Sequence, residues 1–228
     1  MKLKFIDKWR SFSPHAVAIM LKSSFAIICI ALFIRLTFSV ASNGSVQNFD
    51  EGILRWVETL RTPFFNSMML DITALGGLAL TVVLGLLAVA LFLLSRDSAA
   101  AIHLIITATG GFYISAWTKP ILARPRPSII PQLIHASGFS YPSGHSITSA
   151  AIYLTMAILA CRHFKAIKAR VALLTLAGIM IALISFSRIY LGVHYPSDTI
   201  SGALLGLAWA LLTAAAFAKT HFSSNKNI

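Results

Sequence analysis

The sequence predicts an all-α, polytopic membrane protein: one bundle of six transmembrane helices with an amphipathic helix on its outer surface. Composition is the first observation, because 57% of the 228 residues are hydrophobic and only 11% are charged, with a mean hydropathy of +0.79. A soluble domain rarely carries so little charge. The second is a set of six apolar stretches close to the roughly 20 residues that a membrane span needs. With no repeat or linker to divide the chain, residues 1–228 are predicted to form a single domain.

The six predicted spans are residues 21–41, 72–95, 98–117, 146–162, 171–189 and 198–218. The second carries no charged residue. The first contains Arg35 and has an alternative interpretation, because a basic start, an apolar core and SVAS at 39–42 resemble a signal peptide. A retained helix is favoured, since the basic lead-in is long and Arg35 separates the core from the cleavage site. Gly202 and Gly206 in the last span predict close packing against a neighbouring helix.

The segment FDEGILRWVETLRTPFF, between the first two spans, has an amphipathic pattern. Ile53, Val57 and Leu60 fall on one side at helical spacing, and the charged residues lie elsewhere. This spacing predicts a helix lying on the outer membrane surface. A plain connecting loop is the alternative.

Charge predicts the orientation of the chain. The formal net charge of +12 would suggest nucleic acid in a soluble protein, but in a membrane protein it reports orientation and attraction to anionic lipids, so no nucleic-acid partner is expected. With the N-terminus inside, most basic residues fall on the inner side: Lys2, Lys4, Lys8, Arg10, Lys22, Arg96, Arg162, Lys165, Lys168, Arg170, Lys219 and Lys226. Most acids fall outside: Asp50, Glu51, Glu58, Asp71 and Asp198. We therefore expect a bacterial inner-membrane protein with both termini cytoplasmic.

Three polar stretches are placed at the same outer face by this layout: KPILARPRP (119–127), YPSGHS (141–146) and SRIYLGVHYPSD (187–198). Lys119, Arg126 and Arg188 bring three cations, against the single acid Asp198. A positive pocket of this kind favours an anion with several oxygens, and the planar guanidinium suits phosphate. The Ser143 hydroxyl and a glycine-containing turn also open onto a helix N-terminus, which is an anion site in its own right.

Two histidines supply the chemistry that such a pocket needs. A neutral imidazole can attack phosphorus, and a protonated one can give its proton to the leaving alkoxide; His145 and His194 are the candidates. Asp198, four residues after His194, can fix the tautomer of that histidine. No cluster of carboxylates is present to hold magnesium, so we expect neither a metal nor a cofactor. Arg124 is a candidate contact for a second phosphate, although a surface arginine is the commoner role.

Each of these residues has a structural interpretation when taken alone. Asp198 suits the first turn of a helix, and Lys119 and Arg188 suit snorkelling to the membrane surface. Six such placements converging on one face are harder to explain in that way. The convergence therefore favours a functional site.

The three stretches resemble the motifs of the type 2 phosphatidic acid phosphatases, or lipid phosphate phosphatases, in their bacterial integral-membrane branch. The family pattern is Lys, six residues, Arg-Pro; then Pro-Ser-Gly-His; then Ser-Arg, five residues, His, three residues, Asp, and all three parts match in order. The resemblance implies that His194 is the nucleophile that forms a phosphohistidine, that His145 is the general acid, and that Asp198 is the partner of His194. It also implies a phosphate-binding set: Lys119, Arg126, Ser143, Gly144 and Arg188.

The expected substrate is a phosphomonoester or diphosphate on a lipid: undecaprenyl diphosphate, phosphatidylglycerol phosphate, phosphatidic acid or lipid A. Two alternatives stay open. The same pocket suits a phosphotransferase that passes the phosphoryl group to another lipid, and a non-enzymatic lipid or anion transporter would use the pocket without a nucleophile. The sequence does not predict an oligomeric state.

Overall fold

The computed structural model describes residues 13–42 and 44–218. Within these ranges the chain forms eight α-helices and one short 3-10 turn, and no strand. The elements are α2 (Pro14–Ala41), α3 (Ser45–Thr59), α4 (Pro63–Ala74), α5 (Leu78–Leu94), α6 (Ser98–Leu122), α7 (Gly144–Ala160), η1 (Cys161–His163), α8 (Ile167–Tyr190) and α9 (Pro196–Ala216). The predicted all-α class is confirmed. Six of the basic residues assigned to the inner side lie outside the described residues: Lys2, Lys4, Lys8, Arg10, Lys219 and Lys226.

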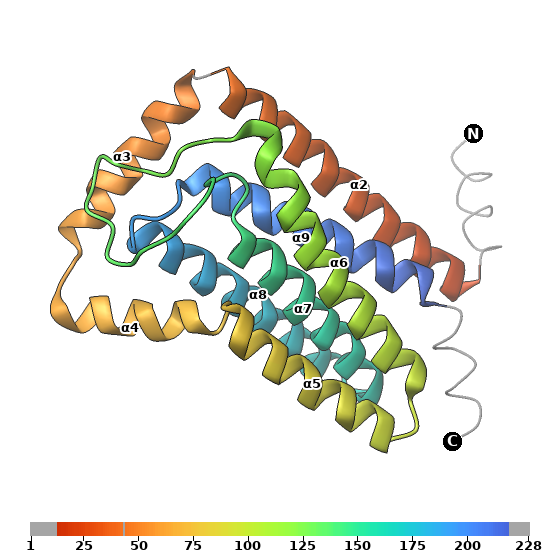
Figure 1. The fold of residues 1–228 in the computed structure, drawn as a ribbon. Coiled ribbons are helices and arrows are strands. Elements are labelled where there is room, and N and C mark those ends of the chain that lie inside the picture. The colour runs from red at the N-terminus through yellow and green to blue at the C-terminus, as the bar shows by residue number, and fades with distance from the viewer. Residues whose placement is uncertain (1–12, 43, 219–228) are drawn as a thin grey trace, which may run out of the picture.

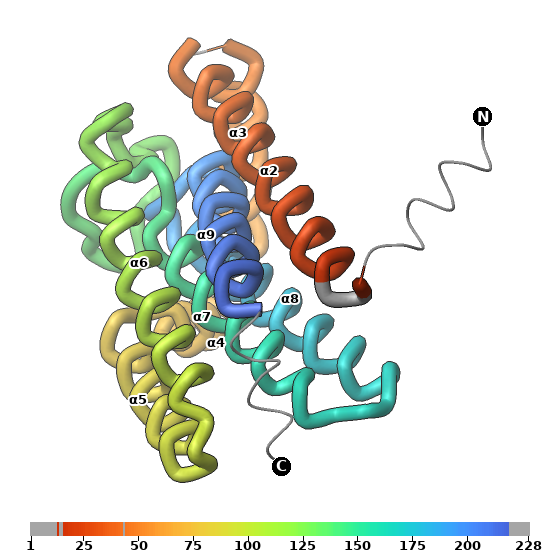
Figure 2. Tube along the Cα trace, turned by 90° about the vertical axis from the view of Figure 1, so that its right-hand side faces the viewer, coloured from red at the N-terminus to blue at the C-terminus, as the bar shows by residue number. Residues whose placement is uncertain are grey.

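The long helices pack around α7. Among the described residues, five helices are long and apolar enough to cross a membrane, and α4 with α5 makes a sixth if the bent pair is one span. Helix α7 lies among α6, α8 and α9, as the two views show (Figures 1 and 2). A Cβ on Gly202 would lie 2.5 Å from the carbonyl oxygen of Ser143, and one on Gly206 would collide with that of Ile147. These two glycines therefore allow α9 to approach α7, as their spacing predicts.

Helix α2 belongs to the bundle and packs along α9 (Figure 1). Ala26 and Cys29 are buried against Ala208, and the Thr37 hydroxyl lies 2.7 Å from the Tyr141 hydroxyl. Because Tyr141 precedes the Pro-Ser-Gly-His motif directly, α2 supports the segment that carries this motif.

The predicted span at 72–95 is not a single continuous helix. Its first turn belongs to α4, the chain breaks at residues 75–77, and α4 meets α5 at an angle of 47°. The break contains Gly76 and Gly77, which have low helix propensity. The Tyr153 hydroxyl on α7 donates to the Leu75 carbonyl at 2.8 Å, so a side chain of the bundle satisfies a carbonyl at the end of α4.

The amphipathic helix is present as α3, but its buried face differs from the prediction. The buried residues are Asp50, Leu54 and Val57, and Leu60, which follows the helix, is 39% exposed. Leu54 and Val57 pack into a core with Tyr190 and other residues around the end of α8. One face of α3 therefore packs on the protein, and Asp50 is carried into the interior with the apolar stripe.

Candidate active site

The three polar stretches meet at one end of the bundle, where α6 and α8 end and α7 and α9 begin (Figure 1). Helix α6 runs five residues past its predicted end, to Leu122, so that Lys119 lies in its last turn. Backbone hydrogen bonds join the stretches: the Ser140 amide donates to the Arg124 carbonyl, and the Ser143 amide donates to the Asp198 carbonyl, both at 2.9 Å. The structure therefore brings together segments that are far apart in the sequence.

A tight turn after α8 places His194. Gly192 has a φ of +76°, which glycine adopts without strain, and a Cβ there would lie 2.9 Å from the Pro131 carbonyl oxygen. The chain then enters α9 through Pro196, in the first turn of the helix, where the fixed φ of proline suits a helix start. This turn sets His194 and Asp198 one helical turn apart, on either side of the start of α9.

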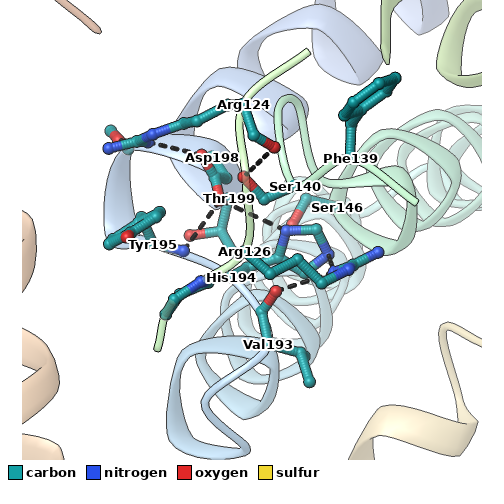
Figure 3. A network of polar contacts seen from close by, with 12 residues as sticks. Arg124, Arg126, Phe139, Ser140, Ser146, Val193, His194, Tyr195, Asp198 and Thr199 are labelled. Carbon is teal, nitrogen blue, oxygen red and sulfur yellow. Dashed lines mark hydrogen bonds and ion pairs between the residues drawn. The ribbon is translucent and has the colours of Figure 1, made fainter. Parts of the chain in front are cut away.

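His194 and Asp198 form a buried pair (Figure 3). Nδ1 of His194 lies 3.4 Å from Oδ2 of Asp198, and the two side chains are 2% and 0% exposed. The approach is long, and Nδ1 has no partner at hydrogen-bond geometry. Oδ2 of Asp198 also accepts from the Tyr195 amide at 2.9 Å. The carboxylate is therefore held by the backbone of the loop that carries the histidine.

Arg126 lies on the opposite side of the His194 ring (Figure 3). Its Nη1 is 3.3 Å from Nε2 of His194 and donates to the Val193 carbonyl at 2.8 Å. Its Nη2 donates to the Ser137 carbonyl at 2.8 Å, and its Nε donates to the Gly138 carbonyl at 3.1 Å. Because a guanidinium can only donate, this contact assigns the lone pair of His194 to Nε2 and the proton to Nδ1, which faces Asp198.

Burial controls the charge of His194. It lowers the pKa of His194 to about 4, and the neighbouring Asp198 carboxylate opposes this effect in part. The histidine is therefore neutral at neutral pH, with the lone pair on Nε2 facing the Arg126 guanidinium. A neutral imidazole is the form that can act as a nucleophile.

Two buried donors close to this pair have no partner. Ser143 Oγ is fully buried and unpaired, and so is Nε of Arg188, whose Nη1 donates to the Thr73 hydroxyl on α4 at 2.8 Å. Buried polar groups are nearly always hydrogen-bonded, so an unpaired one calls for an explanation. Ser143 also precedes the first turn of α7 without capping it, which leaves its hydroxyl and the first amides of the helix available to an anion.

Lys119 and Gly144, two further residues predicted to bind phosphate, also lie near the start of α7. Lys119 Nζ lies 3.4 Å from the Phe139 carbonyl. A Cβ on Gly144 would lie 2.6 Å from Ser115 Oγ on α6 and 3.9 Å from Cε of Lys119. A side chain at residue 144 would therefore displace the Ser115 hydroxyl, at the point where α6 approaches the start of α7.

His145 is half-buried in the first turn of α7. The charges of Arg188, Lys119 and Arg126 act on it, as does the neighbouring His194. The chain break between α4 and α5 passes beside its ring, because a Cβ on Gly76 would lie 3.4 Å from Cδ2 of His145. The second histidine therefore shares the electrostatic environment of the first.

Arg124 does not face the phosphate-binding residues. Its guanidinium donates to Asp198 Oδ1 at 2.7 Å and to Asp50 Oδ2 at 2.8 Å, and also to the side-chain oxygens of Ser197 and Gln47. The expected contact with a second phosphate is not supported, because these carboxylates take up the donors of Arg124. The physical reason is that a buried acid from α3 competes for the guanidinium.

Asp50 is the site residue that the sequence interpretation missed. The sequence alone groups it with the outer acids that report orientation, yet its side chain is 0% exposed and paired with Arg124. The available signal was its position, because Asp50, Leu54 and Val57 follow the i, i+4, i+7 spacing of one helix face. Thr73, the partner of Arg188, carried no comparable signal.

The donor set does not resemble a metal centre. Across residues 13–42 and 44–218, no group of three or more His, Cys, Asp or Glu side chains is placed to share a metal ion. The arrangement that is present combines a neutral histidine, a second histidine, a carboxylate and three cations. Chemically, it can bind a phosphate group and expose it to a nitrogen nucleophile.

Comparison with known proteins shows which family the chain belongs to. The PAP2 superfamily model matches residues 99–222. Phosphatidylglycerophosphatase B of Bacillus subtilis is 31% identical over 185 residues, which cover 79% of this chain and 89% of that protein. The lipid A 1-phosphatase of Rhizobium johnstonii is 34% identical over 110 residues, which cover 44% of this chain and 41% of that protein.

A solved structure shares the fold. The crystal structure of the transmembrane PAP2-type phosphatidylglycerolphosphate phosphatase from Bacillus subtilis superimposes with a TM-score of 0.78 at 27% sequence identity, and the match covers 88% of this chain and 96% of that one. Together with the spans described above, these similarities show that the chain is a multi-pass membrane protein of the PAP2 superfamily and one of its lipid phosphatases.

Proposed function

We propose that this protein hydrolyses a phosphomonoester or diphosphate of a membrane lipid through a phosphohistidine on His194, without a metal ion. The observation that carries the proposal is the orientation of the His194 ring. Its Nδ1 faces the Asp198 carboxylate, and its Nε2 faces the Arg126 guanidinium. A phosphate bound at this guanidinium would lie beside the lone pair of Nε2.

In the first step, Nε2 of His194 forms a bond to phosphorus and the phosphorus–oxygen bond to the lipid breaks. His145, protonated when the anionic substrate is bound, gives its proton to the departing oxygen. Asp198 stabilises the cation that develops on His194. Arg126, Arg188 and Lys119 offset the charge on the other phosphate oxygens, which is where phosphoryl transfer needs stabilisation.

In the second step, water replaces the histidine. His145, now neutral, accepts a proton from the water as the new oxygen–phosphorus bond forms. The nitrogen–phosphorus bond breaks, and its electron pair returns to Nε2. Inorganic phosphate leaves from a monoester, and the histidines regain their starting protonation states.

For the substrate, we propose phosphatidylglycerol phosphate as the first candidate. A relative that is 31% identical and matches along most of both chains is named for that lipid. In addition, Arg124, the residue expected to reach a second phosphate, is bound to carboxylates. Undecaprenyl diphosphate, phosphatidic acid and lipid A complete the panel to be tested. We also propose that the site opens at the outer face of a bacterial inner membrane, in line with the basic inner segments.

The proposal is tested by phosphate release from this panel by purified protein in detergent with a chelator present. We expect release by the native protein and a loss of about 10³-fold or more in His194→Ala. His135→Ala is the matched control, because His135 is an exposed histidine in the neighbouring loop, and it should retain full activity. Release that persists in His194→Ala, or that stops with the chelator and returns with added metal, would contradict the proposal.

A further inference from the structure

We propose that Arg124 and Asp50 form a positioning device that holds the Asp198 carboxylate in place and so aims His194 at the substrate. This inference rests on the proposed role of His194 as the nucleophile. It assigns a function in catalysis to α3, a helix that contributes no residue to the three motifs. It also replaces the expected phosphate contact of Arg124 with a different task.

The guanidinium of Arg124 bridges two buried carboxylates. Nη1 donates to Asp198 Oδ1 at 2.7 Å, Nη2 donates to Asp50 Oδ2 at 2.8 Å, and both carboxylates are 0% exposed. The central carbon of the guanidinium also lies 4.0 Å from the centre of the Tyr195 ring. A planar fork can make these contacts at the same time, whereas an ammonium is a single point charge.

Asp50 is fixed in turn by the first turn of α9. Its Oδ1 accepts from the Ser197 amide at 2.9 Å, and its Oδ2 accepts from the Ser197 hydroxyl. Ser197 directly precedes Asp198 in the chain. The carboxylate from α3 therefore anchors both the guanidinium that contacts Asp198 and the backbone beside it.

The two oxygens of Asp198 consequently have separate tasks. Oδ1 is held by Arg124, while Oδ2 accepts from the Tyr195 amide and faces Nδ1 of His194 at 3.4 Å. With one oxygen fixed, the carboxylate cannot rotate away from the histidine without breaking an ion pair. A small misplacement of a reacting group costs orders of magnitude in rate, so this restraint acts on the chemical step.

Ion pairing couples Arg124, Asp50 and Asp198, because each carboxylate depends on the same guanidinium. One buried cation lies between two buried anions, and removing it would leave Asp50 and Asp198 as buried carboxylates without their counter-ion. Breaking a buried pair in this way is strongly destabilising. The double variant Arg124→Gln/Asp50→Asn replaces both charged groups with amides of similar size. It removes the uncompensated charge at Asp50 and leaves Asp198 as the one carboxylate of the network.

The test measures kcat, KM and the competitive inhibition constant of inorganic phosphate. Arg124→Gln, Arg124→Lys, Asp50→Asn and the double variant are compared with the native protein, and size-exclusion profiles and thermal unfolding in detergent confirm that each variant is folded. We expect kcat to fall about 10²-fold in Arg124→Gln, with KM and the phosphate constant changing less than about threefold. Lysine should recover only a small part of the loss.

Non-additivity is the second readout. If Arg124 and Asp50 act as a unit, the double variant should lose no more kcat than Arg124→Gln alone. Arg55→Gln and Glu58→Gln are the matched controls, because both residues are exposed on α3; they should leave kcat unchanged. The proposal would be overturned if the fold-loss of kcat in the double variant equalled the product of the losses in the two single variants. A raised KM at constant kcat would also overturn it. A raised KM confined to diphosphate lipids would instead assign Arg124 to a second phosphate.

Failure of this inference is distinct from failure of the proposed function. If native protein releases phosphate and His194→Ala does not, while folded Arg124 and Asp50 variants keep native kcat, only the positioning role is wrong. If His194→Ala itself stays active, the proposed function is wrong, and the positioning role falls with it.

Discussion

At the scale of single residues, the proposed reaction depends on His194. The side chain is 2% exposed and lies between a carboxylate and a guanidinium. Burial lowers its pKa to about 4, against the opposing effect of Asp198, whereas a free histidine has a pKa of about 6.5. His194, the proposed nucleophile, is therefore neutral over a wider pH range than an exposed histidine would be.

This shift predicts the acid side of the pH profile. The protonated, inactive form of His194 accumulates only as the pH falls through about 4. After correction for the ionisation of the substrate phosphate and of the proposed general acid His145, kcat/KM should stay nearly constant from pH 7 to pH 5 and decline below that. An acid limb with a midpoint at or above 6.5 would show that the nucleophile has an ordinary pKa.

Asp198→Asn should separate orientation from binding. The amide keeps the size of the side chain but loses the charge that stabilises the cation on His194, so we expect kcat to fall between about 10²- and 10⁴-fold and KM to change less than about threefold. Asp71→Asn, at an exposed acid on α4, is the control and should match the native protein. Equal activity of the two variants would exclude a catalytic role for Asp198.

Motif spacing was sufficient to select the residues that meet at this site, because each motif is local in the sequence. It was insufficient for Arg124 and Asp50, which form an ion pair across 74 residues of chain. Within its own segment, Arg124 looks like one more cation in a basic stretch. Only the packing of α3 against the start of α9 shows that its charge is already balanced.

At the scale of elements, hydropathy located the spanning segments but not the break between α4 and α5. An apolar run indicates that a segment can lie in lipid, but it does not indicate whether the helix axis bends within that segment. The Gly76–Gly77 pair permits the break, and the packing of Tyr153 and Ile184 against it shows where the chain turns. This break brings α4, with Thr73, next to Arg188 in the site.

Gly76→Ala should damage the site through this packing. Its Cβ would collide with the side chain of Ile184 and would lie 3.4 Å from the His145 ring. Overpacking of this kind typically costs about 1–3 kcal/mol of stability, so we expect a lower Tm in detergent and a loss of activity near tenfold. Gly85→Ala is the matched control, because nothing lies within 4 Å of a Cβ there. The account would be wrong if the two variants had the same Tm and activity.

At the scale of the whole molecule, the alternation of the helices collects the site at one end of the bundle. Helices α6 and α8 end there, and α7 and α9 begin there (Figure 1). The segments at residues 95–97 and 161–166 lie at the opposite end and carry Arg96, Arg162 and Lys165. The sequence predicts that the candidate active site and these two basic segments lie at opposite ends of the bundle, because their positions depend only on the order of the spans.

Orientation can be measured with single cysteines in a Cys29→Ala/Cys161→Ser background. His135→Cys, in an exposed loop at the site end, should react with a membrane-impermeant thiol reagent in intact cells whose outer membrane has been permeabilised. Lys165→Cys, exposed at the opposite end, should react only after the inner membrane is opened. The reverse pattern would place the site on the cytoplasmic side.

Trapping the phosphoenzyme tests the proposed phosphohistidine most directly. Native protein is mixed rapidly with lipid substrate carrying a labelled phosphate, quenched in alkali and digested, and the labelled peptide is sequenced. We predict a label that is stable to alkali, labile to acid and attached to His194, and no label in His194→Ala. Rapid phosphate release with no label on His194 at any quench time, or with label on another residue, would contradict the account.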